Sequence, residues 1–318
     1  GNITAAVLID TFVIKTNSSG VFQWVKTYGG SASEFGYRIA VDSSDNVYIT
    51  GHFTGTLDFG GGNVTSVGYV DIFVLKLNSS VLFQWVKTFG DYSADIGYGI
   101  AVDSSSNVYI TGYFVGTVDF GGGNVTSVGN QDIFVLKLNS SGVFQWVNTY
   151  GDTLSDWGYG VAVDSSSNVY ITGYFIGTVD FGAGDITSAG AGDIFVLKLN
   201  SSGVFQWVKT YGNTNGEQGE DIAVDSSGNV YITGGFRETI DFGGGDVTSA
   251  GNKNIFVLKL NTSGVFQWVK TYGGTLTDIG YGIAVDSSSN VHITGSFRGT
   301  VDFGGGCLLY TSDAADES

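Results

Sequence analysis

The chain has 318 residues, of which 42% are hydrophobic, 14% aromatic and 14% charged, a composition that suits a packed core and excludes a disordered linker. Its formal net charge is −17 with only 13 Lys and Arg, which argues against nucleic-acid binding because phosphate recognition needs clustered basic side chains. No apolar run approaches the roughly 18 residues of a membrane-spanning helix, so the sequence predicts no membrane span.

One pattern recurs every 61 residues along the chain. The tryptophan of an FQWV segment keeps this step at five positions, which are Trp24, Trp85, Trp146, Trp207 and Trp268. A fixed period of this length is typical of repeat architectures, in which each repeat is one supersecondary unit.

The repeat from residue 97 to residue 150 predicts four short strands. Residues 99–102 and 108–114 flank an Asp/Ser/Asn turn and form a first hairpin. Residues 133–138 and 143–150 flank an NSSG turn and form a second hairpin, in which Gly142 is expected to take a positive φ. No segment shows a helical period, and Val, Ile, Thr, Tyr and Phe dominate.

The burial pattern of these strands distinguishes between three all-β architectures. The third strand carries Phe134 and Leu136 on one face and Ile133 and Val135 on the other, so both faces are expected to be buried. A sandwich would alternate in every strand, and a parallel solenoid would use much shorter coils. We therefore predict an all-β fold, a β-propeller of four-stranded blades packed face to face around an axis.

Two segments resemble a known repeat family. IAVDSSGNVYITG, from Ile222 to Gly234, and DIFVLKLNSSGVFQW, from Asp193 to Trp207, are similar to the seven-bladed β-propeller repeat (SBBP) family. The resemblance recurs five times between Gly1 and Gly306 and implies a secreted or cell-surface protein of bacteria or archaea, in most cases without a catalytic role. Val81 departs from it by replacing the turn glycine, and Glu220-Asp221 stands where other repeats have Tyr-Gly.

The repeat predicts one propeller over residues 1–306 with five blades, four complete and one composite. The complete blades are expected at about 36–89, 97–150, 159–211 and 220–272, and the composite blade would join 281–306 with 1–28. The alternative is an open arc, which would leave apolar faces and strand edges exposed. Residues 307–318, which hold the single cysteine, match no repeat, and we expect this tail not to be native.

A ligand site is expected on the face that carries the longer loops or in the mouth of the channel. The predicted binding residues are the recurrent loop aspartates and three residues that break the repeat, namely Asp58, Asp119, Asp180, Asp241, Asp302, Trp157, Arg237 and Arg298. The alternative for the aspartates, which we favour, is a turn in which Asp accepts backbone N–H bonds.

The sequence predicts no metal site and no cofactor. Calcium is the only metal that the DSSSN turns suggest, and they offer fewer oxygen donors than calcium requires. No catalytic residue is assigned, because His52 and His292 are the only histidines and build no triad.

We therefore expect a non-catalytic extracellular or cell-surface module for binding or spacing within a larger protein. Its expected partners are other domains of the parent protein or a polysaccharide. The alternative is a carbohydrate-active hydrolase or lyase that uses acidic residues of the interblade loops, such as Glu34, Glu217 and Glu220.

Overall fold

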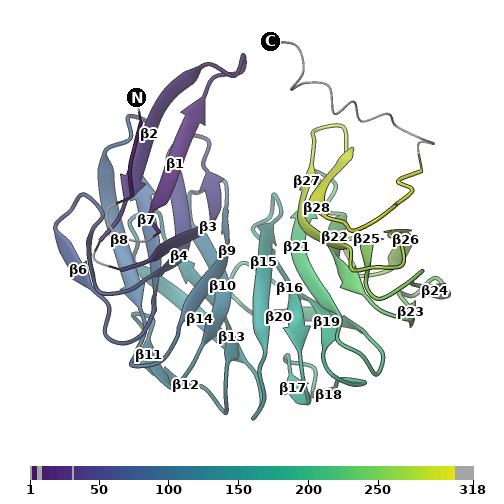
Figure 1. Cartoon of the computed structure of the whole chain (residues 1–318). Coiled ribbons are helices and arrows are strands. Elements are labelled where there is room, and N and C mark those ends of the chain that lie inside the picture. Colours follow the sequence, from purple (N-terminus) through teal and green to yellow (C-terminus); the bar gives the residue numbers. More distant parts are fainter. Residues whose placement is uncertain (1, 6–8, 31, 305–318) are drawn as a thin grey trace.

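The computed structural model describes residues 2–5, 9–30 and 32–304, and within these ranges it contains strands β1 to β28 and no helix (Figure 1). The all-β prediction is confirmed. The predicted non-native tail, residues 307–318, lies outside the described residues.

Four antiparallel sheets of four strands each form the blades, in the order first, second, third and fourth strand. Blade 1 consists of β3 (Glu34–Val41), β4 (Val47–Phe53), β7 (Asp71–Leu77) and β8 (Phe83–Phe89). Blade 2 consists of β9 (Ile96–Val102), β10 (Val108–Phe114), β13 (Asp132–Leu138) and β14 (Phe144–Tyr150). Blade 3 consists of β15 (Trp157–Val163), β16 (Val169–Phe175), β19 (Asp193–Leu199) and β20 (Phe205–Tyr211). Blade 4 consists of β21 (Gln218–Val224), β22 (Val230–Phe236), β25 (Asn254–Leu260) and β26 (Phe266–Tyr272).

The two hairpins of each blade are fixed by polar turn residues. Asp103 accepts hydrogen bonds from the backbone N–H groups of Ser105 and Asn107, both at 2.9 Å, between β9 and β10. Asn139 accepts equivalent bonds between β13 and β14, where Gly142 has a φ of 73°, as predicted. Val81 takes a φ of 64° at the position of that glycine, a conformation that a β-branched side chain rarely adopts.

The long loop after each second strand contains an additional small hairpin that sequence analysis did not predict. These three-residue ladders are β5 (Thr56–Asp58) with β6 (Asn63–Thr65), β11 (Thr117–Asp119) with β12 (Asn124–Thr126), β17 (Thr178–Asp180) with β18 (Asp185–Thr187), and β23 (Thr239–Asp241) with β24 (Asp246–Thr248). They lie along the outer rim of the molecule (Figure 1).

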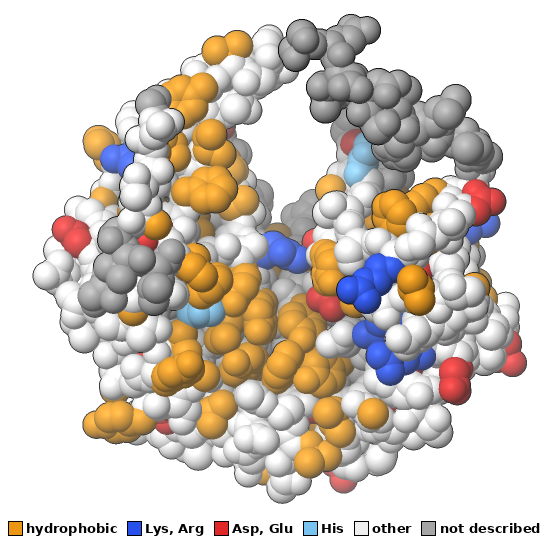
Figure 2. Space-filling model, viewed as in Figure 1, with side chains coloured by type: hydrophobic (Ala, Val, Ile, Leu, Met, Phe, Trp, Pro, Cys, Tyr) orange, Lys and Arg blue, Asp and Glu red, His pale blue; other side chains and the backbone are white. Residues whose placement is uncertain are grey.

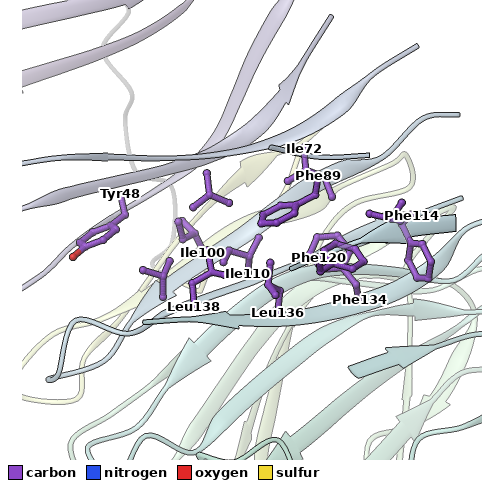
Figure 3. Packing of buried hydrophobic residues seen from close by; sticks show 13 residues of the cluster. Tyr48, Ile72, Phe89, Ile100, Ile110, Phe114, Phe120, Phe134, Leu136 and Leu138 are labelled. Carbon is purple, nitrogen blue, oxygen red and sulfur yellow. The ribbon is translucent and has the colours of Figure 1, made fainter. Parts of the chain in front are cut away.

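The core lies between successive blades rather than in the middle of one layer. One cluster joins Ile72 and Phe89 of blade 1 to Ile110, Phe134 and Leu136 of blade 2, as Figure 3 shows. The third strand is buried on both faces, as predicted. Each such side chain contributes about 1.5–3 kcal/mol on burial, so stacking of blades is the main stabilising interaction.

The two ends of the chain form separate two-stranded sheets. β1 (Thr11–Thr16) pairs only with β2 (Phe22–Tyr28), and β27 (Ile279–Val285) pairs only with β28 (Val291–Ser296), within the described ranges. The expected composite blade of 281–306 with 1–28 is therefore not formed as one sheet. The two hairpins face each other across an opening (Figure 1), because β1 packs on blade 1 and β27 packs on blade 4.

This opening exposes side chains that every complete blade buries. Phe12 of β1 is 66% exposed and Ile293 of β28 is 40% exposed, whereas the equivalent Phe134 and Ile110 are fully buried. The described chain is therefore an arc of four complete blades with a half-blade at each end.

Candidate ligand site at the channel mouth

Each first strand contains one extra residue, and these residues line the channel. In blade 2, Gly97 lies opposite Gly112 and Gly99 lies opposite Thr111, so Tyr98 has no partner in the ladder. The same bulge recurs in all five first strands and defines the bulge ring, Tyr37, Tyr98, Tyr159, Glu220 and Tyr281. A β-bulge re-aims a side chain, and here the ring and Arg38 enclose a cavity of about 270 Å³.

Aromatic side chains of blades 1 to 3 form one continuous surface beside this cavity. We call it the aromatic wall, and its members are Phe35, Tyr37, His52, Tyr98, Tyr113, Trp157, Tyr159 and Tyr174. The ring centroids of Tyr37 and Tyr98 are 5.0 Å apart, and those of Tyr98 and Tyr159 are 5.2 Å apart. Figure 2 shows hydrophobic side chains gathered in the hollow inside the arc.

The wall is uncharged at neutral pH, and burial moves the pKa values of its titratable groups further from neutrality. Burial raises the pKa of Tyr113 and of Tyr174 to about 12 and lowers the pKa of His52 to about 4. The Nδ1 atom of His52 and the Nε1 atom of Trp157 are buried and have no hydrogen-bond partner among the described residues. The wall is thus a mainly aromatic surface with two buried polar atoms that no described residue pairs.

Blade 4 replaces the aromatic side chains with polar ones. Gln218, Glu220, Gly235 and Lys253 stand at the positions that Trp157, Tyr159, Tyr174 and Gly192 hold in blade 3. We call Gln218, Glu220, Asp221 and Lys253 the polar cluster. The polar cluster lies on one side of the aromatic wall. The site is therefore asymmetric around the channel, although the backbone repeats around it.

The members of the polar cluster depend on one another for packing and charge. Lys253 is only 6% exposed, and its Nζ donates to Gln218 Oε1 at 2.8 Å. A Cβ atom at Gly235 would lie 2.9 Å from Lys253 Cδ, so the lysine chain fills the space of the missing tyrosine. Burial raises the pKa of the Glu220 carboxyl, and the nearby Lys253 and Arg38 cations oppose this effect.

Arg38 connects the first unit with the last across the channel. Its Nη2 donates to the Tyr281 carbonyl at 3.0 Å and lies 3.9 Å from Asp221 Oδ2. Asp221 Oδ2 also accepts a hydrogen bond from Ile283 N at 3.0 Å. Arg38 of blade 1 and Asp221 of blade 4 are equivalent positions, and the other three repeats have glycine there. The ion pair is therefore specific to blades 1 and 4.

The structure places the predicted loop aspartates away from this mouth. Asp119 Oδ1 accepts hydrogen bonds from Gly121 N at 2.7 Å and Gly123 N at 2.9 Å, in the outer-rim hairpin of β11 and β12. A Cβ atom at Gly121 would lie 3.1 Å from Phe144, which is on the outermost strand of the blade. Equivalent turns hold Asp58, Asp180, Asp241 and Asp302, so the turn role that we favoured is confirmed.

The other predicted site residues lie in the aromatic wall or directly after a second strand. Trp157 belongs to the aromatic wall and stacks on Tyr113 at 5.3 Å. Arg237 directly follows β22 in blade 4, and Arg298 is its equivalent in the last unit and is exposed. The predicted site residues did not include the tyrosines of the bulge ring or Lys253, whereas Glu220 was considered only as a catalytic acid. The signal that could have found Lys253 is the replacement of several equivalent positions within a single blade.

The interblade acids hold the backbone instead of facing the channel. Asp95 is fully buried and accepts hydrogen bonds from Asp91 N and Val115 N, both at 2.9 Å. Glu34 and Glu217 are its equivalents and are also buried, with backbone donors at Gly30 and Asn213. Of the acids considered for catalysis, only Glu220 lines the cavity.

The described part of the chain contains no group of three or more His, Cys, Asp or Glu side chains that could hold a metal ion. Within residues 2–5, 9–30 and 32–304 there is also no helix long and apolar enough to cross a membrane.

A family of known repeats matches the chain in five places. The family model for the β-propeller repeat, SBBP, matches residues 23–55, 84–113, 145–174, 206–234 and 267–296. Each match covers the fourth strand of one unit and the first two strands of the next.

One curated relative and one solved structure are also similar to the chain. An uncharacterized WD repeat-containing protein, L264 of Acanthamoeba polyphaga mimivirus, is 24% identical over 388 aligned residues, and the match covers 98% of this chain and 28% of that protein. The chain thus spans little more than a quarter of this relative. A crystal structure of a protein of unknown function from Bacteroides caccae aligns with a TM-score of 0.38 and 7% identity, over 80% of this chain and 86% of that one.

Proposed function

The chain is a member of the SBBP β-propeller repeat family, and on this premise we propose that it is a non-catalytic binding module of an extracellular or cell-surface protein. We propose further that its ligand is a polysaccharide, bound at the channel mouth. One observation carries the proposal: side chains that break the repeat meet beside a continuous aromatic wall. A single ligand needs a site that is not repeated around the axis.

The chemistry of the mouth suits a sugar. A pyranose ring has apolar C–H faces that pack on aromatic side chains, and its hydroxyl groups need donors and acceptors at the edge. Tyr98 and Tyr159 provide the aromatic surface, and Gln218 and Glu220 provide amide and carboxylate groups at its end.

The hydrolase or lyase alternative is less well supported. It requires two carboxyl groups that face one bond of the substrate. Glu34 and Glu217 are buried and accept backbone N–H bonds, which leaves Glu220 and the ion-paired Asp221 at the channel. The variant Glu220→Gln tests this alternative, since loss of a measured glycan-cleaving activity would favour catalysis over binding.

The binding proposal can be tested with variants of the wall. The intact chain is titrated with soluble polysaccharides, neutral and acidic, and compared with Tyr98→Leu and Tyr159→Leu, which keep bulk but remove the aromatic ring. We expect affinity to fall by about 5- to 150-fold in each, because one ring stacked on an aromatic side chain contributes on the order of 1–3 kcal/mol. Tyr92→Leu is the matched control, because Tyr92 is 84% exposed and outside the wall. Binding that is absent for every polymer, or unchanged in both wall variants, would overturn the proposal.

A further inference from the structure

The two half-blades expose complementary strand edges. β28 is a second strand, and in each complete blade the second strand pairs with the third strand over seven residue pairs. Among the described residues β28 pairs only with β27. β1 is a third strand, and in the same ranges it pairs only with β2. One half-blade therefore lacks a third strand, and the other offers one.

A groove beside β28 has the form of the site that a third-strand phenylalanine fills in a complete blade. In blade 4 the ring centroid of Phe242 lies 5.4 Å from that of Tyr211 and 5.0 Å from that of Phe256, which is on the third strand. In the last unit the equivalent Phe303 lies 5.8 Å from Tyr272, and the described residues include no third-strand phenylalanine beside it. The groove that results measures about 480 Å³, and its lining includes Ile255, Ile293, Gly295 and Phe297.

β1 carries the side chains that fill this groove in the complete blades. Phe12 and Ile14 are 66% and 52% exposed, whereas Phe134 and Leu136, at the same positions in blade 2, are fully buried. Val13, on the opposite face of β1, already packs on blade 1. The exposed face of β1 is thus the face that packs on the preceding blade in every complete repeat.

The charges of the two half-blades are complementary as well. In a complete blade the third-strand lysine lies near the aspartate of the turn between the first two strands. In blade 2, burial lowers the pKa of Lys137, and the Asp103 carboxylate opposes this effect. The equivalent lysine on β1 is Lys15, and the equivalent aspartate before β28 is Asp286; both are exposed.

We propose that the chain forms a reciprocal dimer in which the β1–β2 hairpin of each copy adds to β28 of the other. The register of blade 2 then places Phe12 opposite Gly295 and Ile14 opposite Ile293. Within one copy the two hairpins lie on opposite sides of the opening (Figure 1) and form no common sheet.

Exchange between two copies satisfies both free edges at once. Each copy offers one donor hairpin and one acceptor edge, so a two-fold arrangement pairs all of them. The Val13 face of β1 loses nothing, because it packs on blade 1 of the second copy instead of its own. The connection from β2, which ends at Tyr28, to β3, which begins at Glu34, is short, and short connections favour exchange of this kind.

Cysteine pairing tests the partner and the register together. Ile14→Cys and Ile293→Cys are made in separate chains that also carry Cys307→Ser, and the two are mixed in urea, refolded together and oxidised. Residues directly opposite each other on antiparallel strands lie within disulfide reach, so we expect a disulfide-linked dimer from the mixture. Val204→Cys mixed with Ile293→Cys is the matched control, because Val204 is 57% exposed in the turn between β19 and β20.

Sedimentation of the parent chain measures the association itself. We expect a dimer that dissociates on dilution. Phe12→Asp and Ile293→Asp should each raise its dissociation constant by roughly 100-fold or more, because a reciprocal contact loses two apolar side chains at once. Val204→Asp, which places the same charge on an exposed site of blade 3, should leave the constant unchanged.

Three results would overturn the inference. The first is a parent chain that is monomeric at every concentration. The second is a chain carrying both Ile14→Cys and Ile293→Cys that links only within one copy, which would show that its own hairpin closes the ring. The third is a dimer that both aspartate variants leave intact. The inference goes beyond the proposed function, because binding of a polysaccharide at the channel mouth is measured separately and stands or fails by its own test.

Discussion

Reverting blade 4 to the residues of blade 3 should stabilise the fold and abolish ligand binding. The variant carries Gln218→Trp, Glu220→Tyr, Gly235→Tyr and Lys253→Gly, so that it reproduces the arrangement of Trp157, Tyr159, Tyr174 and Gly192. The four changes replace the charged and amide groups of the polar cluster with aromatic rings. Such rings already pack together in blade 3, where the ring centroids of Trp157 and Tyr174 are 5.2 Å apart.

The magnitude follows from the burial of the cluster. Replacing buried charged groups by well-packed apolar side chains is neutral or stabilising by about 1–4 kcal/mol even where the charges are paired, and we expect a gain in that range. Removing one member alone has the opposite sign. Lys253→Met keeps the chain that covers Gly235 but removes the cation that most favours the charged form of Glu220; for a fully buried pair such a loss costs about 3–5 kcal/mol. Because Glu220 is only half-buried, we expect about 1–3 kcal/mol.

Urea unfolding followed by circular dichroism measures both changes, with Lys209→Met as the control for loss of one surface charge. The penalty for Lys253→Met should be larger at pH 8 than at pH 5, because protonation of Glu220 removes the uncompensated charge. The reasoning is refuted if the fourfold variant is less stable than the parent chain, or if Lys253→Met is no more damaging than the control.

Three further predictions concern residues outside the polar cluster. Asp119→Ala should lower the free energy of unfolding by about 0.5–1.5 kcal/mol, measured by urea titration, and leave polysaccharide affinity unchanged, since Asp119 only closes a rim turn. Burial raises the pKa of Asp95 and of Asp156 to about 7, so the folded state retains protons that the unfolded state releases. Stability should therefore fall as pH rises from about 4 to about 7, by at most about 1.4 kcal/mol per unit and group, and Asp95→Asn should flatten that slope. Tyr109→Phe should cost about 1.5–3 kcal/mol in thermal unfolding, because its buried hydroxyl lies 3.0 Å from Asp103 Oδ2; an unchanged midpoint would contradict this.

The fold was predictable from the sequence because each blade is specified locally. Turn residues such as Asp103 and Gly142 mark the hairpins, and the doubly apolar third strand marks the stacking of blades. The closure of the ring was not predictable in the same way. It depends on the angle between blades summed over the whole arc, and no single residue pattern encodes that sum. The packing of β1 on blade 1 and of β27 on blade 4 keeps the half-blades apart.

The candidate site was predictable only in part, for a related reason. Trp157, Arg237 and Arg298 stood out because they break the repeat, and Trp157 lies in the aromatic wall beside the cavity. Tyr98 did not stand out, because its exposure to the channel follows from a bulge that moves one residue out of the ladder, and a bulge leaves no clear pattern in the alternation of side chains. Asp119 stood out for its regularity, which is a sign of a structural turn.

The polar residues that replace aromatic ones are concentrated in blade 4 at the channel mouth. This concentration indicates that the mouth has a role that the rest of the arc does not share. A buried Lys253 or a half-buried Glu220 alone in an otherwise aromatic row would be costly. Here Gly235 makes room for Lys253, Gln218 accepts its hydrogen bond and Glu220 supplies its counter-charge. Such mutual compensation within one blade keeps charge in the channel at a tolerable cost. The cost is easiest to explain if the charge serves a ligand, because the neighbouring blade shows that the fold itself has no need of it.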